Sequence, residues 1–579
     1  MYIAHGNMLM KIVSSRLTDT RVNLKGGHSE ATGWLVALGV YIAAMCLWLN
    51  ALLWQWGSAF WTVPKPFIGD WMADVFAFEQ FPRAVLAGHW PLFTHLLNYP
   101  VGVNLTWTAL NYTWSLLVYP VTQIFGVIAA YNTLIFFISI TNGLAMYWAG
   151  RQLIDKRSAA IIGGLIYMFS PYAVGQNMLS HLNLMAIWTI PVAWVLLYDL
   201  LHRHMYSPCR IGVALGFLMV IQAFTCEEIL LVIGVAGAIW MAVWVACHIF
   251  ANDLNARPLF KALLWGAPPV VLGVGPLLYA QLTVMPLHGY LYNPLQYVSS
   301  PVVWFLPGVF VRFTLPAIKL AVNNLVFAPA ETSTYIGLPF IVIAWMLWRQ
   351  ERVLARVLVV VVAVSLILTL GVLGYVPVFP IKDMLPVRLS VLEYFAISLA
   401  VVIFCDSPVI ARWQRWLLVA ALCLSWVPTQ LVALSPALPR FFTHYPVSYT
   451  NQALLVLPFA QLPPTSVSQY WQAVAGDRFA MTGGYYAARG NLQPRYFATG
   501  PTVTALTADF YSMTAYGILI VPRDRVHSLS SYIQQHHVSA IVVGPEPHEN
   551  LVRDTIAYWM GKQPRFIEGV WVWSIRRPG

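Results

Sequence analysis

The chain consists of long apolar runs that are separated by short polar breaks. A helix needs about 20 mostly apolar residues to cross a bilayer, and many of these runs reach that length. The first of them, residues 32–56, is too long for the core of a signal peptide and lacks a clear cleavage site. It therefore predicts an uncleaved transmembrane helix. Counting the runs by the same criterion predicts about 11 transmembrane helices.

Lysine and arginine are concentrated in certain breaks between the apolar runs. Breaks of this kind usually lie on the cytoplasmic side of the membrane. The basic breaks are residues 151–157, 202–210, 252–261, 349–356 and 406–415, together with the N-terminal segment 1–30. We therefore expect the N-terminus and all of these breaks to be cytoplasmic.

If every apolar run crossed the membrane, successive breaks would lie on alternate sides. One apolar run does not fit this alternation. Residues 106–128 are apolar enough to span, but a crossing there would put the basic break 151–157 outside. The run also contains Asn111, Pro120 and Gln123. It predicts an amphipathic or re-entrant helix packed at the outer face. Residues 300–327, which prolines and cations interrupt, have a similar character.

The sequence becomes more polar after residue 438. Short apolar runs there predict strands, and stretches with helical periodicity lie between them. The predicted strands are residues 453–458, 517–522, 539–544 and 570–575, and the predicted helices are residues 468–476, 527–537 and 550–561. Residues 520–545 resemble one β-α-β unit. The region lacks a glycine-rich phosphate loop, which argues against a nucleotide site.

These patterns predict an α-helical polytopic membrane protein with a C-terminal extracytoplasmic α/β domain. Its parts are a cytoplasmic segment (1–30), a transmembrane domain (31–438) whose first outer loop with surface helices is 57–128, and the α/β domain (439–579). The composition agrees, because 59% of the 579 residues are hydrophobic and only 9% are charged. The net charge of +11 lies largely in short loops and does not indicate nucleic-acid binding. The six cysteines lack metal-ligand spacing and are expected to pack as small apolar residues.

The first outer loop carries three carboxylates close together: Asp70, Asp74 and Glu79. Asp70 precedes a helical pattern, so it is an N-cap, a catalytic base, or both. Asp74 lies one helical turn later on the same face. It is either a second carboxylate for an acceptor or a metal ion, or a solvated partner of Arg83. We expect a structural role for Glu79.

Several short motifs follow one another along the membrane region. They are Gly69-Asp70, AVLAGHWPLF (84–93), YPVGVNL (99–105), FGVIAAYN (125–132), GLIYMFSPY (164–172), SHLNLMAIWTIP (180–191), ETSTYIGLP (331–339) and LPVRL (385–389). In this order they resemble a bacterial branch of the GT-C superfamily, which contains multi-pass glycosyltransferases. The resemblance implies that a sugar is taken from a polyprenyl-phosphate carrier at the outer face. It also implies an inverting transfer with Asp70 as the general base.

Cations on the outer side are candidates for binding the donor phosphate. Arg388 stands where a hydrophobic helix begins and resembles the arginine that precedes a late helix of the family. An arginine at that depth is costly unless it is paired or reaches the headgroups, and a phosphate is a suitable bidentate partner. Lys382, Arg83 and His181 complete this set, although a lone histidine at a helix end more often makes a structural hydrogen bond.

Other polar residues on the outer side are candidates for binding the sugar or the acceptor. They are His89, Glu227, Glu228, Glu331 and Tyr335. Two adjacent acids near the bilayer, as at 227 and 228, are costly without a purpose, and sugar hydroxyls are suitable partners. The alternative for these acids is a solvated turn.

The function that the sequence favours is an enzyme at the outer face of the bacterial inner membrane. We expect a polyprenyl-phosphate-linked sugar donor, a glycan, lipid or protein acceptor, and no nucleic-acid partner. No cofactor is required; the paired acids permit a divalent cation, but no ligand spacing demands one. The alternatives are a lipid or sugar flippase or transporter, an O-antigen-ligase-like enzyme, and a noncatalytic scaffold. Transporters usually show internal repeats and charges near the bilayer midplane, and neither pattern is evident in the sequence.

Overall fold

The computed structural model describes most of the chain. The described residues are 27–62, 70–108, 111–250, 255–283, 294–332, 334–350, 352–372, 385–408, 410–461, 465–489, 497–499, 503–519 and 525–575. The chain forms two compact units. The first unit contains Met1–Leu53, Ile135–Pro276 and Asn293–Leu431, and the second contains Trp54–Leu134, Leu277–Tyr292 and Val432–Gly579.

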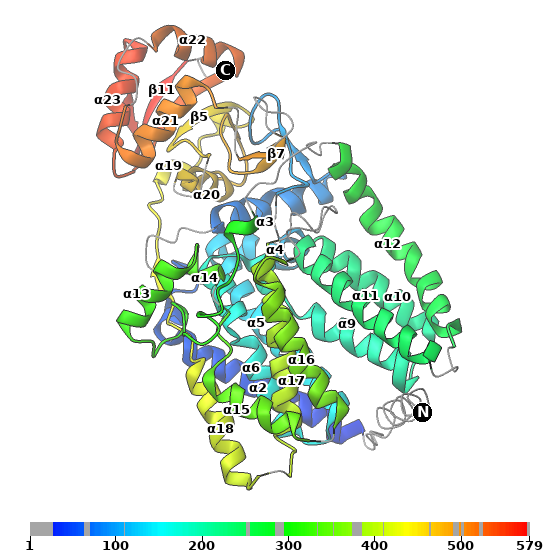
Figure 1. The fold of residues 1–579 in the computed structure, drawn as a ribbon. Helices are drawn as coiled ribbons and strands as arrows, with labels where there is room; N and C mark the ends of the chain where they lie inside the picture. The colour runs from blue at the N-terminus through cyan, green and yellow to red at the C-terminus, as the bar shows by residue number, and fades with distance from the viewer. Residues whose placement is uncertain are drawn as a thin grey trace. The chain divides into compact units, whose positions relative to one another are not determined.

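The first unit is helical. Its helices are α2 (Gly27–Leu49), α6 (Arg157–Met168), α7 (Pro171–Met178), α8 (Leu182–Met185), α9 (Thr189–Tyr198), α10 (Pro208–Ala223), α11 (Glu227–Phe250), α13 (Pro316–Leu325), α14 (Pro329–Thr332), α15 (Leu338–Trp348), α16 (Val353–Leu368), α17 (Ser390–Phe404) and α18 (Arg412–Ser425). Most of α5 (Val127–Leu153) and of α12 (Arg257–Thr283) also belongs to it. Helix α17 is buried along its whole length, and α16 and α6 pack against it. It is the central helix of this unit (Figure 1).

Within the described residues, seven helices are long and apolar enough to cross a membrane. They are Glu30–Gln55, Val127–Leu153, Arg157–Met178, Leu182–Arg203, Glu227–Ala246, Arg257–Thr283 and Pro386–Phe404. Three shorter apolar helices accompany them: Pro208–Ala223, Leu338–Trp348 and Val353–Leu368. The protein is therefore a multi-pass membrane protein, and its first apolar run forms a helix as predicted. The total of about 11 crossings stays a prediction.

Contacts within the first unit join the breaks that are predicted to be cytoplasmic. Lys156 Nζ lies 3.3 Å from Asp406 Oδ1, which joins break 151–157 to break 406–415. Gln350 Nε2 donates a hydrogen bond of 2.8 Å to Ser407 Oγ, which brings break 349–356 to the same place. These three breaks therefore lie on one side of the unit.

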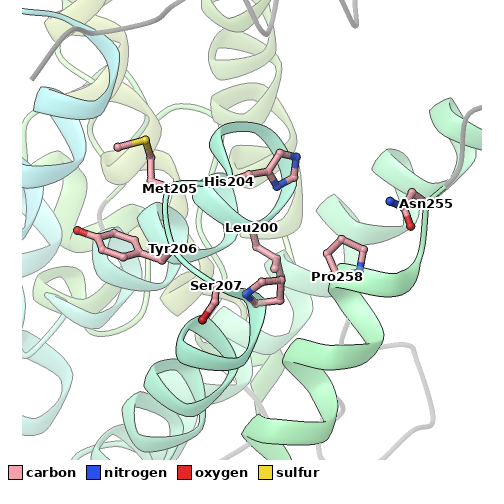
Figure 2. Close-up of a pocket in the computed structure, with 8 residues that line it drawn as sticks. Leu200, His204, Met205, Tyr206, Ser207, Asn255 and Pro258 are labelled. Atoms are coloured by element: carbon pink, nitrogen blue, oxygen red, sulfur yellow. The ribbon is translucent and has the colours of Figure 1, made fainter.

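The two remaining breaks join the same side. Arg203 Nη1 donates a hydrogen bond to Gln152 Oε1 and connects break 202–210 to break 151–157. A hollow of about 430 Å³ lies where break 202–210 meets break 252–261 (Figure 2). It is lined by Leu200, His204, Met205, Tyr206, Ser207, Pro208, Asn255 and Pro258, none of which is a candidate site residue. The basic breaks thus share one side, as the charge pattern predicts, and the assignment of that side to the cytoplasm stays a prediction.

The run 106–128 forms the short helix α4 (Tyr112–Phe125) in the second unit. Its 14 residues would rise about 21 Å, well short of the roughly 30 Å thickness of the hydrocarbon core. Helix α4 is therefore shorter than a typical spanning helix, and its place at the outer face stays a prediction. The similar run 300–327 contains only the ten-residue helix α13.

The second unit contains the strands of the structure. They are β1 (Phe60–Thr62), β2 (Phe93–Thr94), β3 (Val103–Asn104), β4 (Val432–Leu434), β5 (Ala453–Leu457), β6 (Ala480–Met481), β7 (Ala487–Arg489), β8 (Phe497–Thr499), β9 (Val538–Val543), β10 (Arg565–Ile567) and β11 (Val570–Ser574). The main sheet has the order β10-β11-β9-β5-β6. Strands β5, β9 and β6 are parallel, whereas β11 and β10 are antiparallel to their neighbours.

Helices surround this sheet in the C-terminal region (Figure 1). They are α19 (Arg440–Thr443), α20 (Val467–Val474), α21 (Ala505–Tyr516), α22 (Val526–Gln535) and α23 (Glu549–Met560). Phe510 of α21 and Trp559 of α23 pack with Ile541 of β9 in one buried apolar cluster. The predicted strands at 453–458, 539–544 and 570–575 and the three predicted helices are present. The predicted strand 517–522 falls largely on residues outside those that the structure describes, and α21 is an element that the pattern did not predict.

The first outer loop belongs to the same compact unit as the C-terminal region. Strand β1 pairs antiparallel with β4, so that Trp61 faces Ala433. Helix α3 (Trp71–Leu86) packs against α20 and against α4. The rings of Trp71 and Tyr470 lie 6.0 Å apart, and Phe60 packs between them. The second unit therefore joins the first outer loop to the C-terminal region, although most of the first unit lies between them in the sequence.

Candidate functional site

Asp70 immediately precedes α3 and occupies its N-cap position. Its backbone carbonyl accepts hydrogen bonds from the backbone N–H groups of Ala73, at 2.9 Å, and Asp74, at 3.1 Å. Its carboxylate makes no side-chain capping hydrogen bond to the described residues of α3. Instead, Tyr485 Oη donates a hydrogen bond of 2.8 Å to Asp70 Oδ1. Helix capping therefore does not explain the carboxylate, which is half-buried and held by a tyrosine hydroxyl.

Asp74 is buried on the next turn of α3. Asn111 Nδ2 donates a hydrogen bond of 2.9 Å to Asp74 Oδ1. Burial raises the pKa of Asp74 well above its ordinary value, the hydrogen bond from Asn111 opposes that shift, and the nearby charge of Asp70 adds to it. The sequence offered a solvated ion pair with Arg83 as one alternative, but Arg83 pairs with Glu79 instead. A role for Asp74 as a second carboxylate stays a prediction.

We expect Asp74→Asn to remove a pH dependence of stability. The pKa of Asp74 is raised in the folded chain above its ordinary value of 3.8, so the folded state binds the proton more tightly. Stability is therefore full below that ordinary value and falls as the pH rises through the folded pKa, with a slope of at most about 1.4 kcal/mol per pH unit. In the variant this slope should be absent. Thermal unfolding in detergent between pH 4 and 9 measures the difference.

Asparagine is a well-matched replacement for Asp74 in this structure. Asn111 Oδ1 is buried and has no hydrogen-bond partner among the described residues, so an amide at position 74 can donate to it. The variant should be at least as stable as the parent chain at neutral pH. A variant that is less stable at every pH would contradict this account of Asp74.

Glu79 and Arg83 form an ion pair one turn apart on α3. Arg83 Nε lies 2.9 Å from Glu79 Oε2, and Gln123 Nε2 donates to both oxygens of Glu79 at 2.9 and 3.1 Å. Arg83 Nη1 also donates to the carbonyl oxygen of Gly476. Glu79 is thus structural, as the sequence indicates. A phosphate would have to compete with these partners for Arg83, whose role in phosphate binding stays a prediction.

A second group of charged residues lies in the first unit, around Arg388. Arg388 Nε and Nη2 donate to Glu331 Oε1 at 2.9 and 2.6 Å, and Nη1 pairs with Glu228 Oε1. Arg388 and Glu331 are largely buried, while the Glu228 side chain is 36% exposed. Glu228 Oε2 has no hydrogen-bond partner among the residues that the structure describes. The group carries one positive and two negative charges, which favours hydroxyl donors over an anion at Glu228.

Other candidates line the same region of the first unit. His181 Nδ1 lies 2.9 Å from Gln176 Oε1. Burial raises the pKa of Glu331, but the charges of Arg388 and His181 outweigh that effect, and the net shift is downward. Glu331 therefore stays ionised at neutral pH. Tyr335 is buried, and its backbone carbonyl accepts a hydrogen bond of 3.3 Å from Tyr394 Oη.

The remaining candidates are less constrained by the structure. His89 follows α3 in the second unit and is exposed. Glu227 is exposed at the start of α11 in the first unit. Lys382 lies outside the described residues. Within the part of the chain that is described, no group of three or more His, Cys, Asp and Glu side chains is arranged to hold a metal ion.

The sequence reasoning did not identify Tyr485, Gln176 or Tyr172 as residues near the candidate sites. Tyr172 is buried in α7, and its hydroxyl lies within the electrostatic reach of Arg388, Glu228 and Glu331. No local pattern marks Tyr485, because its partner Asp70 is 415 positions away. Only the pairing of the two chain segments brings them together.

The comparisons place the fold among known membrane enzymes. No family model and no curated protein sequence matches the chain. Among solved structures, it is similar to the arabinofuranosyltransferase AftD from Mycobacteria, with a TM-score of 0.52 and 15% identity over 89% of this chain and 36% of that chain. It is also similar to the oligosaccharyltransferase AglB from Archaeoglobus fulgidus, with a TM-score of 0.44 and 11% identity over 88% of this chain and 69% of that chain. The chain thus spans about a third of the length of the mycobacterial protein.

Proposed function

Because the chain has the fold of the GT-C glycosyltransferases, we propose that it is a membrane glycosyltransferase. Its donor is a sugar carried on a polyprenyl phosphate, and its acceptor is a hydroxyl group of a glycan, lipid or protein at the outer face of the bacterial inner membrane. The observation that carries this proposal is the carboxylate of Asp70, which stands at the start of α3 without a capping bond and is held by a tyrosine hydroxyl.

The proposed reaction inverts the configuration at the anomeric carbon. An acceptor hydroxyl attacks this carbon, a new carbon–oxygen bond forms, and the bond to the phosphate oxygen breaks. The electron pair of the broken bond goes to the lipid phosphate. The proton of the acceptor goes to the carboxylate of Asp70 and then to water. The leaving phosphate is already a good leaving group, so no general acid is needed.

The residues around Arg388 have a separate part in this proposal. Glu228 and Glu331 can accept hydrogen bonds from sugar hydroxyls, and Glu228 Oε2 is a buried acceptor without a partner among the described residues. Arg388 has five N–H donors, and each of its three nitrogens uses one of them to bind Glu228 or Glu331. One donor therefore remains on each of the two terminal nitrogens, and these two can bind the lipid phosphate. The guanidinium of Arg388 would stabilise the negative charge that develops on the leaving phosphate in the transition state.

The proposal predicts a missing sugar in cells that lack the protein. Mass spectrometry of envelope glycans and glycolipids should show the loss of one glycosyl residue and an accumulation of the unmodified acceptor. The parent gene should restore the sugar, and a gene that carries Asp70→Asn should not. An unchanged set of glycans and glycolipids would contradict the proposed function.

A further inference from the structure

Tyr485 donates a hydrogen bond to the candidate base from a part of the chain that sequence reasoning treated as a separate domain. From this contact we infer that Tyr485 is a positioning residue for Asp70, and that the C-terminal region is an integral part of the catalytic site. This inference rests on the proposed function. It assigns a role to a residue through its contact with Asp70 rather than with the substrate.

The backbone on the N-terminal side of Tyr485 is tied to the first outer loop by three hydrogen bonds. Met481 N donates to the carbonyl oxygen of Leu96 at 2.8 Å. Asn98 N donates to the carbonyl oxygen of Gly483 at 3.2 Å, and Tyr99 N donates to that of Met481 at 3.1 Å. The segment 481–483 therefore runs along residues 96–99 as part of one structure.

The backbone on the C-terminal side of Tyr485 is tied to the same loop. Ala487 N donates to Thr108 Oγ1 at 3.1 Å, and Thr108 Oγ1 donates to the carbonyl oxygen of Ala487 at 3.4 Å. Gly484 packs closely on the same loop, because an added Cβ would lie 3.0 Å from the ring of Tyr486 and 3.1 Å from the Cβ of Leu97. The backbone on both sides of Tyr485 is thus held against the loop that carries Asp70.

Helix α20 holds Tyr485 from a third direction. Tyr485 N donates to Gln469 Oε1 at 2.7 Å, and Gln469 Nε2 donates to the carbonyl oxygen of Tyr485 at 3.4 Å. Gln469 is fully buried, and its helix packs on α3, whose first turn follows Asp70. The backbone position of Tyr485 is therefore set by the surrounding structure and does not depend on the bond of its hydroxyl to Asp70.

This placement has a defined chemical effect. A hydrogen bond donated to a carboxylate orients it and favours its charged form, which is the form that accepts a proton. The hydroxyl also fixes which oxygen of Asp70 is directed at Tyr485, and so determines the direction in which the other oxygen points. Without this bond the carboxylate can rotate away from the acceptor hydroxyl.

Tyr485→Phe tests the inference in the purified full-length chain. We expect kcat to fall about 10- to 100-fold, because a hydrogen bond to a charged group is lost. The KM for a synthetic polyprenyl-phosphate sugar and the midpoint of thermal unfolding should change little, because the hydroxyl acts on Asp70 and not on the donor. Tyr449→Phe is the matched control, since it removes a tyrosine hydroxyl that lies 2.9 Å from Ser574 Oγ in the same unit. It should leave kcat unchanged.

The outcomes separate the inference from the function on which it rests. A parent chain that transfers no sugar from any donor overturns the proposed function and the inference together. An active parent chain with an unchanged Tyr485→Phe variant overturns the inference alone. If Tyr485→Phe does not fold, Gln469→Met removes the side-chain support of Tyr485, and the same fall in kcat at an unchanged KM is expected. A fall in kcat that comes with an equal rise in KM or with a loss of thermal stability would show that Tyr485 is only structural and would overturn the inference.

Discussion

Asp70→Asn is expected to lower sugar transfer by about 10²- to 10⁴-fold, which is the usual contribution of a general base. The amide has the shape of the carboxylate but cannot accept the proton of the acceptor hydroxyl. Its oxygen can still accept the hydrogen bond from Tyr485 Oη, and the backbone carbonyl of residue 70 still accepts the first bonds of α3. The measurement is the initial rate of transfer by the purified chain at saturating donor.

Asp74→Asn is the matched control for this experiment. It makes the same chemical change one turn later on α3, at a carboxylate that is buried against Asn111. We expect it to keep transfer within a few-fold of the parent rate. If Asp70→Asn were fully active, Asp70 would not be the base. If both variants were inactive, the two acids would act as a pair.

Arg388→Ala is expected to lower the free energy of unfolding by about 3–5 kcal/mol, because it leaves two acids without their shared cation in a largely buried place. The charges of Glu228 and Glu331 would then repel each other. Arg388 is also the candidate for binding the donor phosphate, so the KM for the donor should rise more than the KM for the acceptor. Thermal unfolding and the two KM values measure these effects.

A second substitution separates the two roles of Arg388. Combining Arg388→Ala with Glu331→Gln removes one of the unpaired charges and should restore part of the stability. It should not restore donor binding if the guanidinium contacts the phosphate. Arg525→Ala is a matched control, because it breaks the ion pair of 2.7 Å with buried Asp509 in the C-terminal region. It should lower stability without a selective effect on the donor. Full recovery of donor use in the double variant would remove Arg388 from the phosphate site.

Much of the membrane architecture follows from local properties of the sequence. Apolar runs of sufficient length predict the spanning helices, and the position of Lys and Arg predicts which breaks share a side. The contacts of Lys156 with Asp406 and of Gln350 with Ser407 agree with that prediction. The run 106–128 forms the short helix α4, and its predicted place at the outer face stays a prediction.

The organisation of the second unit could not be predicted in the same way. The pattern predicted a linear series of domains, whereas residues 54–134 form one compact unit with residues 432–579. Pairing of β1 with β4 depends on residues that are separated by most of the chain, and no local periodicity encodes such a pairing. Helix α21 was not predicted, although its buried positions Leu506, Phe510 and Met513 have the i, i+4, i+7 spacing of an amphipathic helix.

The candidate site was predictable in its residue types but not in its partners. A cluster of acids in an apolar chain identified Asp70 and Asp74, and the cost of burying a cation identified Arg388. Which groups satisfy these charges depends on tertiary contacts. No local pattern indicates that Arg388 shares two acids or that Tyr485 holds Asp70.

The central claim is that this chain breaks the bond between a sugar and a lipid phosphate. The most direct measurement uses the purified protein in lipid nanodiscs with a panel of synthetic polyprenyl-phosphate monosaccharides and short glycan acceptors. The account predicts that one donor releases free polyprenyl phosphate, that the sugar appears on an acceptor with inverted anomeric configuration, and that Asp70→Asn does neither. If the protein in sealed vesicles moved the intact donor across the bilayer and released no polyprenyl phosphate, the account would be contradicted in favour of a transporter.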